Sequence, residues 1–142
     1  MKSKMSLISN NFRFNAQGSS TKKSQSDAKE LCENAGGRLY EPMSNGFSSD
    51  FNYLMIVAKW KQVQGTNAEG WIGIIDSSPD DATAGPEWVY TNSGNEVTNV
   101  FWENNEPTNG NGECVLFKAK AIGRWANENC AVAHNFICEF GK

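Results

Sequence analysis

Two polar tracts of this 142-residue chain contain the residue types that bind hard cations. Residues 103–113 read E-N-N-E-P-T-N-G-N-G-E, and residues 76–81 read D-S-S-P-D-D. Calcium takes about six to eight oxygen ligands from carboxylates, amides and main-chain carbonyls, so a calcium loop is rich in Asp, Glu and Asn with turn-forming Gly and Pro. Both tracts are therefore candidate calcium sites, although polar turns that bind no metal share this composition.

The residue patterns of common enzyme chemistry are missing from the sequence. The chain has one histidine, His134, and it lacks a G-x-S-x-G elbow, an H-E-x-x-H motif and a glycine-rich phosphate loop. Its sixteen acidic residues are scattered, so no carboxylate pair stands out as the acid and base of a glycosidase. We therefore expect a protein that is not an enzyme, with His134 as a partly exposed residue at a strand edge.

Four cysteines bear on the compartment of the protein: Cys32, Cys114, Cys130 and Cys138. None forms a C-x-x-C pair, and they have no zinc-site spacing with His134. An even count of this kind favours two disulfides and an extracellular setting, with three pairings open at this point. The alternative is four buried thiols in a cytosolic protein. Residues 1–17 lack the apolar run of a signal peptide, so the chain is either a mature form with a starting methionine or cytosolic.

The composition is that of one folded domain. Hydrophobic residues make up 39% of the chain and charged residues 20%, and we expect a single domain over residues 1–142 with a polar N-terminal extension at 1–11. Thirteen basic and sixteen acidic residues give a net charge of −3, which argues against nucleic acid as a partner. The longest apolar cluster, residues 54–58, is too short for a membrane span and is flanked by charge.

Apolar residues at helical spacing predict two helices in the first half of the chain. Residues 27–35 follow Ser24 and stop at Gly36, which are typical start and stop signals. A second helix is predicted from Ser48 or Ser49 to about residue 63. We expect its apolar stripe to face the core; the stripe consists of Phe51, Leu54, Met55 and Ala58. Of the five tryptophans, we expect Trp60 to be exposed and Trp71, Trp88, Trp102 and Trp125 to belong to the core.

From residue 70 onward the sequence changes to short β-type runs separated by Asn, Gly, Ser and Pro. With a brief run over residues 38–42, the predicted strands are 71–75, 88–91, 97–102, 114–119, 124–125 and 136–140. Helices followed by strands indicate an α+β fold with a mostly antiparallel sheet. Its two long polar loops, residues 76–87 and 103–113, are where we expect a functional site, because loops of this length in a compact domain are generally functional.

Four short motifs resemble those of the C-type lectin-like domain. They are W-I-G-I at residues 71–74, E-P-T at 106–108, W-A-N at 125–127 followed by Cys130, and F-I-C-E at 136–139, and all four cysteines fit in order and spacing. The resemblance extends over roughly residues 12–140. It implies two helices with antiparallel sheets and long polar loops, and it implies the disulfides Cys32–Cys138 and Cys114–Cys130.

The resemblance also implies calcium. In the family, the principal ion is held by side chains that flank a cis proline, by an acid before a strand cysteine and by the N-D of W-N-D, and a sugar binds the same ion through two vicinal hydroxyls. Carried over by position, the principal set is Glu106, Thr108, Glu113, Ala126 and Asn127. An auxiliary ion takes Asp76, Asp80, Asn109 and Glu113.

Four departures from the family pattern affect the principal set. Thr108 offers a hydroxyl in place of an amide carbonyl, and Ala126 offers no side-chain oxygen. Asn127 is neutral where the family has aspartate, which removes a charge from a site whose affinity grows with charge. Glu113 directly abuts Cys114, one place nearer than the usual acid of the principal site.

We therefore expect a secreted, calcium-dependent lectin that binds a terminal hexose of glycans. The expected sugar contacts are Glu106, Thr108, Glu113 and Asn127. E-P-T is nearer to the family's E-P-S, which goes with galactose, than to the E-P-N that goes with mannose, so a galactose-type sugar is favoured. Weak single-site binding makes a homodimer or higher oligomer useful. The alternative, motivated by Ala126 and Asn127, is a calcium-independent protein-interaction or ice-binding module on the same fold.

Overall fold

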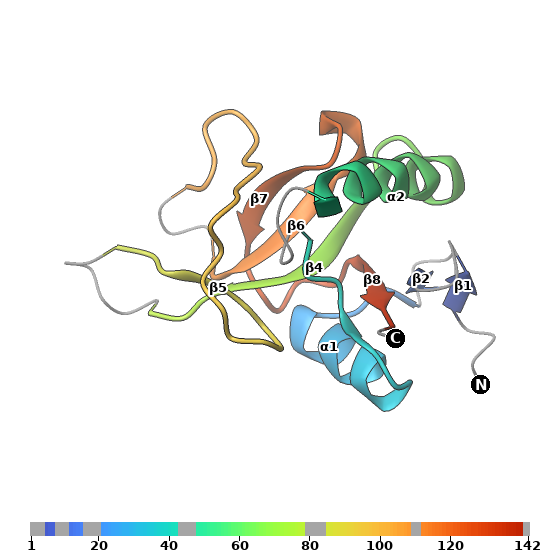
Figure 1. Cartoon of the computed structure of the whole chain (residues 1–142), viewed down its shortest axis with the longest axis horizontal. Coiled ribbons are helices and arrows are strands. Elements are labelled where there is room, and N and C mark those ends of the chain that lie inside the picture. Colours follow the sequence, from blue (N-terminus) through green and yellow to red (C-terminus); the bar gives the residue numbers. More distant parts are fainter. Residues whose placement is uncertain are drawn as a thin grey trace.

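The structure is a computed structural model that describes residues 5–7, 12–15, 21–42, 48–78, 85–108 and 112–140. Helices α1 (Gln25–Asn34) and α2 (Ser48–Gln64) lie on opposite sides of the strands at the centre of the molecule (Figure 1). No helix in these residue ranges is long and apolar enough to cross a membrane.

Helix α1 begins at a serine cap and ends at a glycine. The Ser24 hydroxyl accepts a hydrogen bond from the Asp27 main-chain N–H at 3.3 Å, and Asp27 places a negative charge in the first turn, where the helix dipole favours it. Gly36 follows with a φ of 97°, a conformation that glycine adopts without strain. The predicted helix over residues 27–35 is confirmed, with a start at Gln25.

The expected buried face of helix α2 is wrong. The buried side chains are Tyr53, Ile56, Val57 and Trp60. Leu54 and Met55 are 47% and 57% exposed, and Ala58 is exposed as well. The side chain of Phe51 lies outside the described residues. Trp60, expected to be exposed, is completely buried.

Two glycines explain which face of α2 is buried. A Cβ on Gly70 would lie 2.7 Å from the Trp60 ring, and a Cβ on Gly123 would lie 2.7 Å from a methyl group of Val57. The missing side chains therefore make room for this face of the helix. Apolar residues occur on both faces of α2, so the sequence period alone does not distinguish them.

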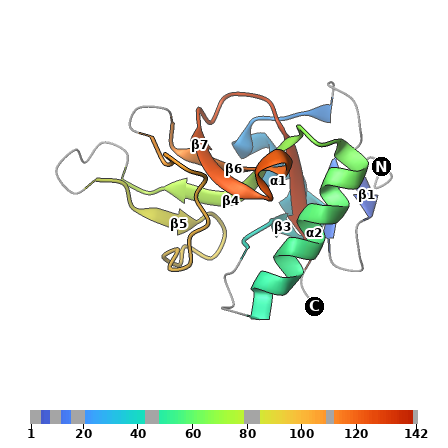
Figure 2. The same ribbon diagram turned by 90° about the horizontal axis from the view of Figure 1, so that it is seen from above.

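The strands form a mostly antiparallel sheet (Figure 2). They are β1 (Met5–Leu7), β2 (Phe12–Asn15), β3 (Arg38–Leu39), β4 (Glu69–Asp76), β5 (Trp88–Tyr90), β6 (Cys114–Lys118), β7 (Arg124–Glu128) and β8 (Asn135–Glu139), with a short 3-10 helix, η3 (Ala119–Ala121). The strand order is β1-β2-β8-β4-β6-β7, with β3 on β8 and β5 on β4. Of the described strand pairs, only β4–β8 is parallel.

Some strand predictions need correction. Residues 97–102 form no strand; an isolated bridge occurs at Trp102, and another at Glu96 just before this range. Strands β1 and β2 were not predicted, and β1 lies within the polar stretch of residues 1–11. Polar residues dominate this stretch. Strand β1 pairs with β2, which in turn pairs with β8, and this pairing between distant segments leaves no local signal in the sequence.

Strand β4 separates two apolar clusters. Ile72 and Ile74 pack toward α2, and Trp71 packs toward α1, as expected for side chains that alternate along a strand. The Gln25 side-chain amide fixes α1 to this strand, because its NH₂ group donates to the main-chain oxygens of Ile72 at 2.9 Å and Ile74 at 3.0 Å.

Both implied disulfides are present. Cys32–Cys138 joins α1 to β8, and Cys114–Cys130 joins β6 to the segment that follows β7. The described residues contain no free cysteine. The α+β fold with two helices, a mostly antiparallel sheet and two disulfides is therefore confirmed.

Candidate ligand-binding loop

A wall of tryptophans positions the start of the long polar loop. The Trp102 ring lies between the rings of Trp88 and Trp125, with centroid distances of 5.2 Å and 5.8 Å. The Glu103 main-chain N–H donates to the Trp125 oxygen at 2.8 Å. Residues 103–108 therefore leave the apolar core next to β7, and we refer to them as the loop segment (Figure 1, yellow-orange). As predicted, Trp71, Trp88, Trp102 and Trp125 all pack in or against the core.

The loop segment turns sharply before its last two residues. Asn105 has a φ of 70°, and the Glu106 main-chain N–H donates back to the Glu103 oxygen at 2.9 Å. The peptide bond between Glu106 and Pro107 is cis, as the resemblance implies. Glu106 and Thr108, on either side of this proline, are half-buried.

The side chain of Asn127, on β7, binds Thr108 of the loop segment through both its oxygen and its nitrogen, and its nitrogen also binds Gly112. Its oxygen accepts from the Thr108 main-chain N–H at 2.9 Å and from the Thr108 hydroxyl at 3.3 Å. Its NH₂ group donates to the main-chain oxygens of Thr108 at 2.8 Å and Gly112 at 2.9 Å. Asn127 is only 7% exposed, and its hydrogen-bonding capacity is fully used. We call this arrangement of Asn127, Thr108 and Gly112 the amide clip.

The residue two places before Cys114 is Gly112, and its backbone explains why a side chain is absent there. Gly112 has a φ of 138°, and a Cβ at this position would lie 2.2 Å from the main-chain carbon and oxygen of Glu128. A side chain therefore cannot be added without moving the loop or β7. Glu113, the next residue, is exposed, and its main-chain oxygen accepts from the Asp76 N–H at 2.8 Å.

A lysine supplies positive charge beside the loop segment. The Lys118 ammonium lies 3.0 Å from a carboxylate oxygen of Glu103. Burial lowers the pKa of Lys118, but the hydrogen bond to Glu103 and the charges of Glu103, Glu69 and Glu106 outweigh this effect and raise the pKa above its ordinary value. One carboxylate oxygen of Glu106 is buried and has no hydrogen-bond partner among the described residues.

The role of Lys118 was not predicted from the sequence. The partnership with Glu103 depends on the packing of residues far apart in the chain, and no local pattern signals it. From the sequence alone, a lysine at the end of a strand is expected to be solvated. Here it partly balances the acidic residues of the loop segment.

The auxiliary set is only partly described. Asp76 and Glu113 are neighbours through their main chains, whereas Asp80 and Asn109 lie outside the described residues. One Asp76 carboxylate oxygen accepts from the main-chain N–H groups of Ser78 at 3.0 Å and Glu87 at 2.9 Å. Asp76 therefore closes the base of the loop that follows β4.

His134 lies just before β8 and packs among other side chains. Its ring is 5.0 Å from that of Trp71 in an edge-on arrangement, and Nε2 is 3.1 Å from a carboxylate oxygen of Glu128. The side chain is 14% exposed. These contacts give His134 a structural role at the start of β8.

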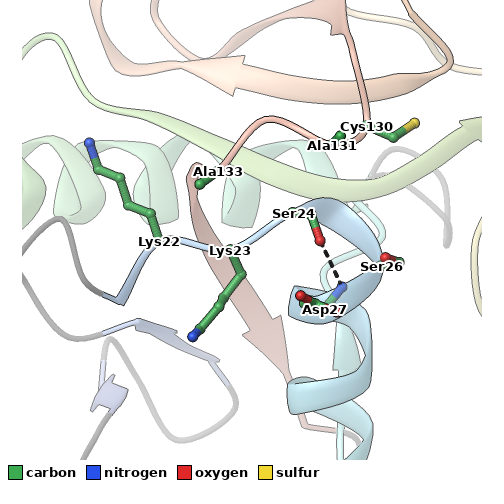
Figure 3. A pocket seen from close by; sticks show the side chains of 8 residues that line it. All are labelled: Lys22, Lys23, Ser24, Ser26, Asp27, Cys130, Ala131 and Ala133. Carbon is green, nitrogen blue, oxygen red and sulfur yellow. Dashed lines mark hydrogen bonds between the residues drawn. The ribbon is translucent and has the colours of Figure 1, made fainter.

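A hollow of about 640 Å³ lies elsewhere, at the start of α1 (Figure 3). Its lining includes Lys22, Lys23 and Ser24 together with Ala131. Figure 3 shows the Ser24 hydroxyl turned back to cap the helix. The hollow includes none of the residues that the sequence nominates for calcium or sugar.

Comparison with known proteins identifies the family of this chain. A family model described as the Lectin C-type domain matches residues 21–140. The chain belongs to the C-type lectin domain family. It is 34% identical over 115 residues to C-type lectin domain family 3 member A from Homo sapiens, covering 80% of this chain and 53% of that protein. The chain thus spans about half the length of this relative.

Solved C-type lectin folds are similar to the structure. Human lithostathine matches with a TM-score of 0.72 and 19% identity, covering 98% of this chain and 89% of the other. A calcium-independent type II antifreeze protein matches with a TM-score of 0.63 and 21% identity, covering 96% and 90%. At this identity the likeness concerns the fold alone.

The principal calcium position does not have the donors that the ion requires. Calcium takes about six to eight oxygens, whereas the described residues of the principal set offer free side-chain oxygens only at Glu106, Thr108 and the exposed Glu113, which stands one place nearer to Cys114 than the family's acid. Ala126 has no side-chain oxygen, and Asn127 uses its oxygen within the amide clip. The described residues also contain no group of three or more His, Cys, Asp or Glu that could hold a metal. The side chains in place therefore do not fit a calcium ion at the principal position.

Proposed function

We propose that this chain is a non-catalytic carbohydrate-binding domain whose ligand surface is the loop segment together with the adjacent end of β7. The observation that carries the proposal is the half-buried position of Glu106 and Thr108 on a turn fixed at both ends, by the tryptophan wall and by the amide clip. Carboxylate and hydroxyl oxygens at such a turn are partners for sugar hydroxyls. Membership of the C-type lectin domain family supports this assignment.

A galactose-type sugar is the first ligand class to test. The reason is the likeness of E-P-T at residues 106–108 to the E-P-S of galactose-type relatives. Thr108 keeps the hydroxyl that serine would provide and adds a methyl group. Mannose-type sugars are the natural comparison, because the family's E-P-N carries an amide at this position.

Calcium enters this proposal at the auxiliary position. Asp76 and Glu113 have neighbouring main chains, and Asp80 and Asn109 complete the set that the resemblance implies. An ion held there would neutralise acidic side chains at the base of both long loops. The sugar would then contact Glu106 and Thr108 directly.

A calcium-independent protein-interaction or ice-binding module is the second candidate function. It is favoured by Ala126, which has no oxygen donor, and by the engagement of Asn127 in the amide clip. The fold itself is compatible with this role, since one solved structure of similar fold is described as a calcium-independent antifreeze protein.

The two disulfides support an extracellular location, because oxidised cysteines persist in oxidising compartments. A single small sugar site binds weakly, so we also propose that the domain acts in dimers or larger arrays that multiply its avidity.

A glycan array probed in calcium and in excess chelator tests the proposed function. The Glu106→Ala variant should lose the glycan signal and remain folded, because the glutamate is part of the proposed ligand surface. Glu30→Ala is the matched control, since Glu30 is an exposed acid on α1 and its loss changes the net charge equally. A folded protein that binds no glycan in either buffer, or a Glu106→Ala variant that binds as the wild type does, would overturn the carbohydrate proposal and favour the second candidate.

A further inference from the structure

We propose that Asn127 is a positioning residue that holds the loop segment in its binding geometry without a calcium ion. The proposal starts from the disagreement between the side chains at the principal position and the needs of calcium. It rests on the proposed function only in its last step, from an ordered loop to ligand binding.

The amide clip works like a short β-bridge made by a side chain. Asn127 presents one donor and one acceptor to the same residue, pairing with the main-chain oxygen and the main-chain N–H of Thr108 at 2.8 Å and 2.9 Å. The second N–H of the amide reaches Gly112 at 2.9 Å, on the far side of the loop. One buried side chain therefore ties both sides of the loop to β7.

The orientation of the Asn127 amide is determined by its neighbours. If the oxygen and nitrogen of the side chain were exchanged, the oxygen would face the carbonyl oxygens of Thr108 and Gly112, and the NH₂ group would face the Thr108 N–H. Each of these contacts would be repulsive. The amide oxygen is thus directed toward Thr108, where two donors already occupy it.

Gly112 makes the clip possible. Its main chain lies against Glu128, so close that a Cβ would meet the main-chain oxygen of Glu128 at 2.2 Å. This approach brings the Gly112 oxygen within 2.9 Å of the Asn127 amide. It also removes any acidic side chain from the position two residues before Cys114. The feature that closes the loop is therefore the same feature that withholds a metal ligand.

An aspartate at position 127 would change this balance. Its second carboxylate oxygen would take the place of the NH₂ group and face the carbonyl oxygens of Thr108 and Gly112. These like partial charges repel one another, and a cation between them would relieve the repulsion. Asparagine therefore makes the loop independent of a metal, and aspartate would make its closure depend on a cation.

Amide hydrogen exchange of the full-length chain tests the proposal. The Thr108 N–H is observed in calcium and in chelator for the wild type, Asn127→Asp and Asn127→Ala. Asn129→Asp is the matched control, because it makes the same change two residues away, where the exposed side chain serves only as an acceptor for the Ala131 N–H among the described residues.

The wild type and Asn129→Asp should exchange this proton at the same slow rate in both buffers. Asn127→Ala should exchange it about tenfold faster in both, as expected for the loss of a buried hydrogen bond. Asn127→Asp should exchange about tenfold faster in chelator and should be slowed by calcium. A purely structural role for Asn127 would not produce this response to calcium.

Two results would overturn the proposal. One is a wild-type Thr108 N–H that loses its protection in chelator, and the other is an Asn127→Ala variant that keeps wild-type protection. If Asn127→Ala does not fold, the responses of the wild type and Asn127→Asp to chelator decide the question. Glycan binding is measured on the same samples, so an ordered loop that binds no glycan would count against the proposed function and leave the clip intact.

Discussion

Two of the regions in which the described residues bury polar side chains differ in charge, because one contains charged groups and the other a neutral amide. Near the end of β8, Arg38, Glu41 and Glu139 form what we call the carboxylate cluster. Glu41 is 2% exposed, and its carboxylate accepts from the Asn92 N–H at 2.7 Å and lies 3.2 Å from the Arg38 guanidinium. Glu139 accepts from Arg38 Nε and from the Glu41 N–H, both at 2.9 Å.

This difference in charge predicts that one region matters for the stability of the fold and the other for the order of the loop. Buried charges are costly when a partner is removed, so the carboxylate cluster should matter most for the free energy of unfolding. A buried neutral amide has a smaller desolvation penalty, so the amide clip can be lost with less damage to the fold. We therefore expect changes near the cluster to lower stability and changes near the clip to alter the loop.

Removing the disulfides of the two regions should have the largest effects on stability. The chain-entropy model assigns roughly 4 to 5 kcal/mol to a closed loop as long as that of Cys32–Cys138, and roughly 3 kcal/mol to one as short as that of Cys114–Cys130. Urea unfolding of the two double alanine variants, without reductant, measures both losses. A larger loss for the Cys114–Cys130 pair would contradict the comparison.

Glu41→Ala and Asn127→Ala compare the two buried groups directly. Glu41→Ala leaves the N–H groups of Asn92 and Ser93 without their acceptor and Arg38 with Glu139 as its remaining partner, and it should lower the free energy of unfolding by roughly 3 kcal/mol. Asn127→Ala should lower it by roughly 1 kcal/mol. Urea midpoints at neutral pH give both values, and equal losses would remove the distinction between the regions.

The pH dependence of stability should report on Glu139. Burial raises the pKa of Glu139 above its ordinary 4.5, although the Glu41 N–H and Arg38 oppose the shift. The folded state therefore holds this proton more tightly, so the contribution of Glu139 is full below about pH 4.5 and is lost as the pH rises through the folded-state pKa. Between pH 7 and 5 the wild type should gain more stability than Glu139→Gln.

Glu33→Gln is the matched control for this measurement. A hydrogen bond from Lys29 lowers the pKa of Glu33, so its stabilising contribution is lost only as the pH falls below 4.5. Urea midpoints of this variant at pH 7 and 5 should follow the wild type. A Glu139→Gln profile parallel to that of the wild type would show that Glu139 binds no extra proton on folding.

Thr108→Val should have the smallest effect on stability. The main-chain bond to Asn127 remains, and only the longer hydroxyl contact of 3.3 Å is lost, so the free energy of unfolding should change by about 0.5 kcal/mol or less. Glycan binding should fall if the hydroxyl contacts the sugar, and Thr108→Ser should retain it. A loss of stability above about 1 kcal/mol would mean that the hydroxyl contributes as much to the clip as a main-chain hydrogen bond does.

The sequence predicted those features that local patterns or family motifs encode. The helix over residues 27–35, the buried strand around Trp71 and the two disulfides are all present. The buried face of α2 was predicted wrongly because apolar residues occur on both faces of that helix. Which face is buried depends on Gly70 and Gly123, which lie far away in the chain.

The candidate site was predicted in location but not in its internal bonding. Glu106, Thr108 and Asn127 do lie together beside β7. Whether Asn127 serves a metal or the loop depends on where the main chains of Thr108 and Gly112 lie, and no residue pattern encodes those distances. The assignment of these residues to calcium and sugar stays a prediction.

The pairing of β2 with β8 determines how the domain can be displayed. Strands β2 and β8, which lie near the two ends of the sequence, are side by side at one end of the molecule, and the loop segment lies toward the other (Figures 1 and 2). A tether at either end of the chain would therefore point the loops away from the support. An array that fixes many copies by one end would present all their loops to the same target, and chemical coupling through random lysines would not.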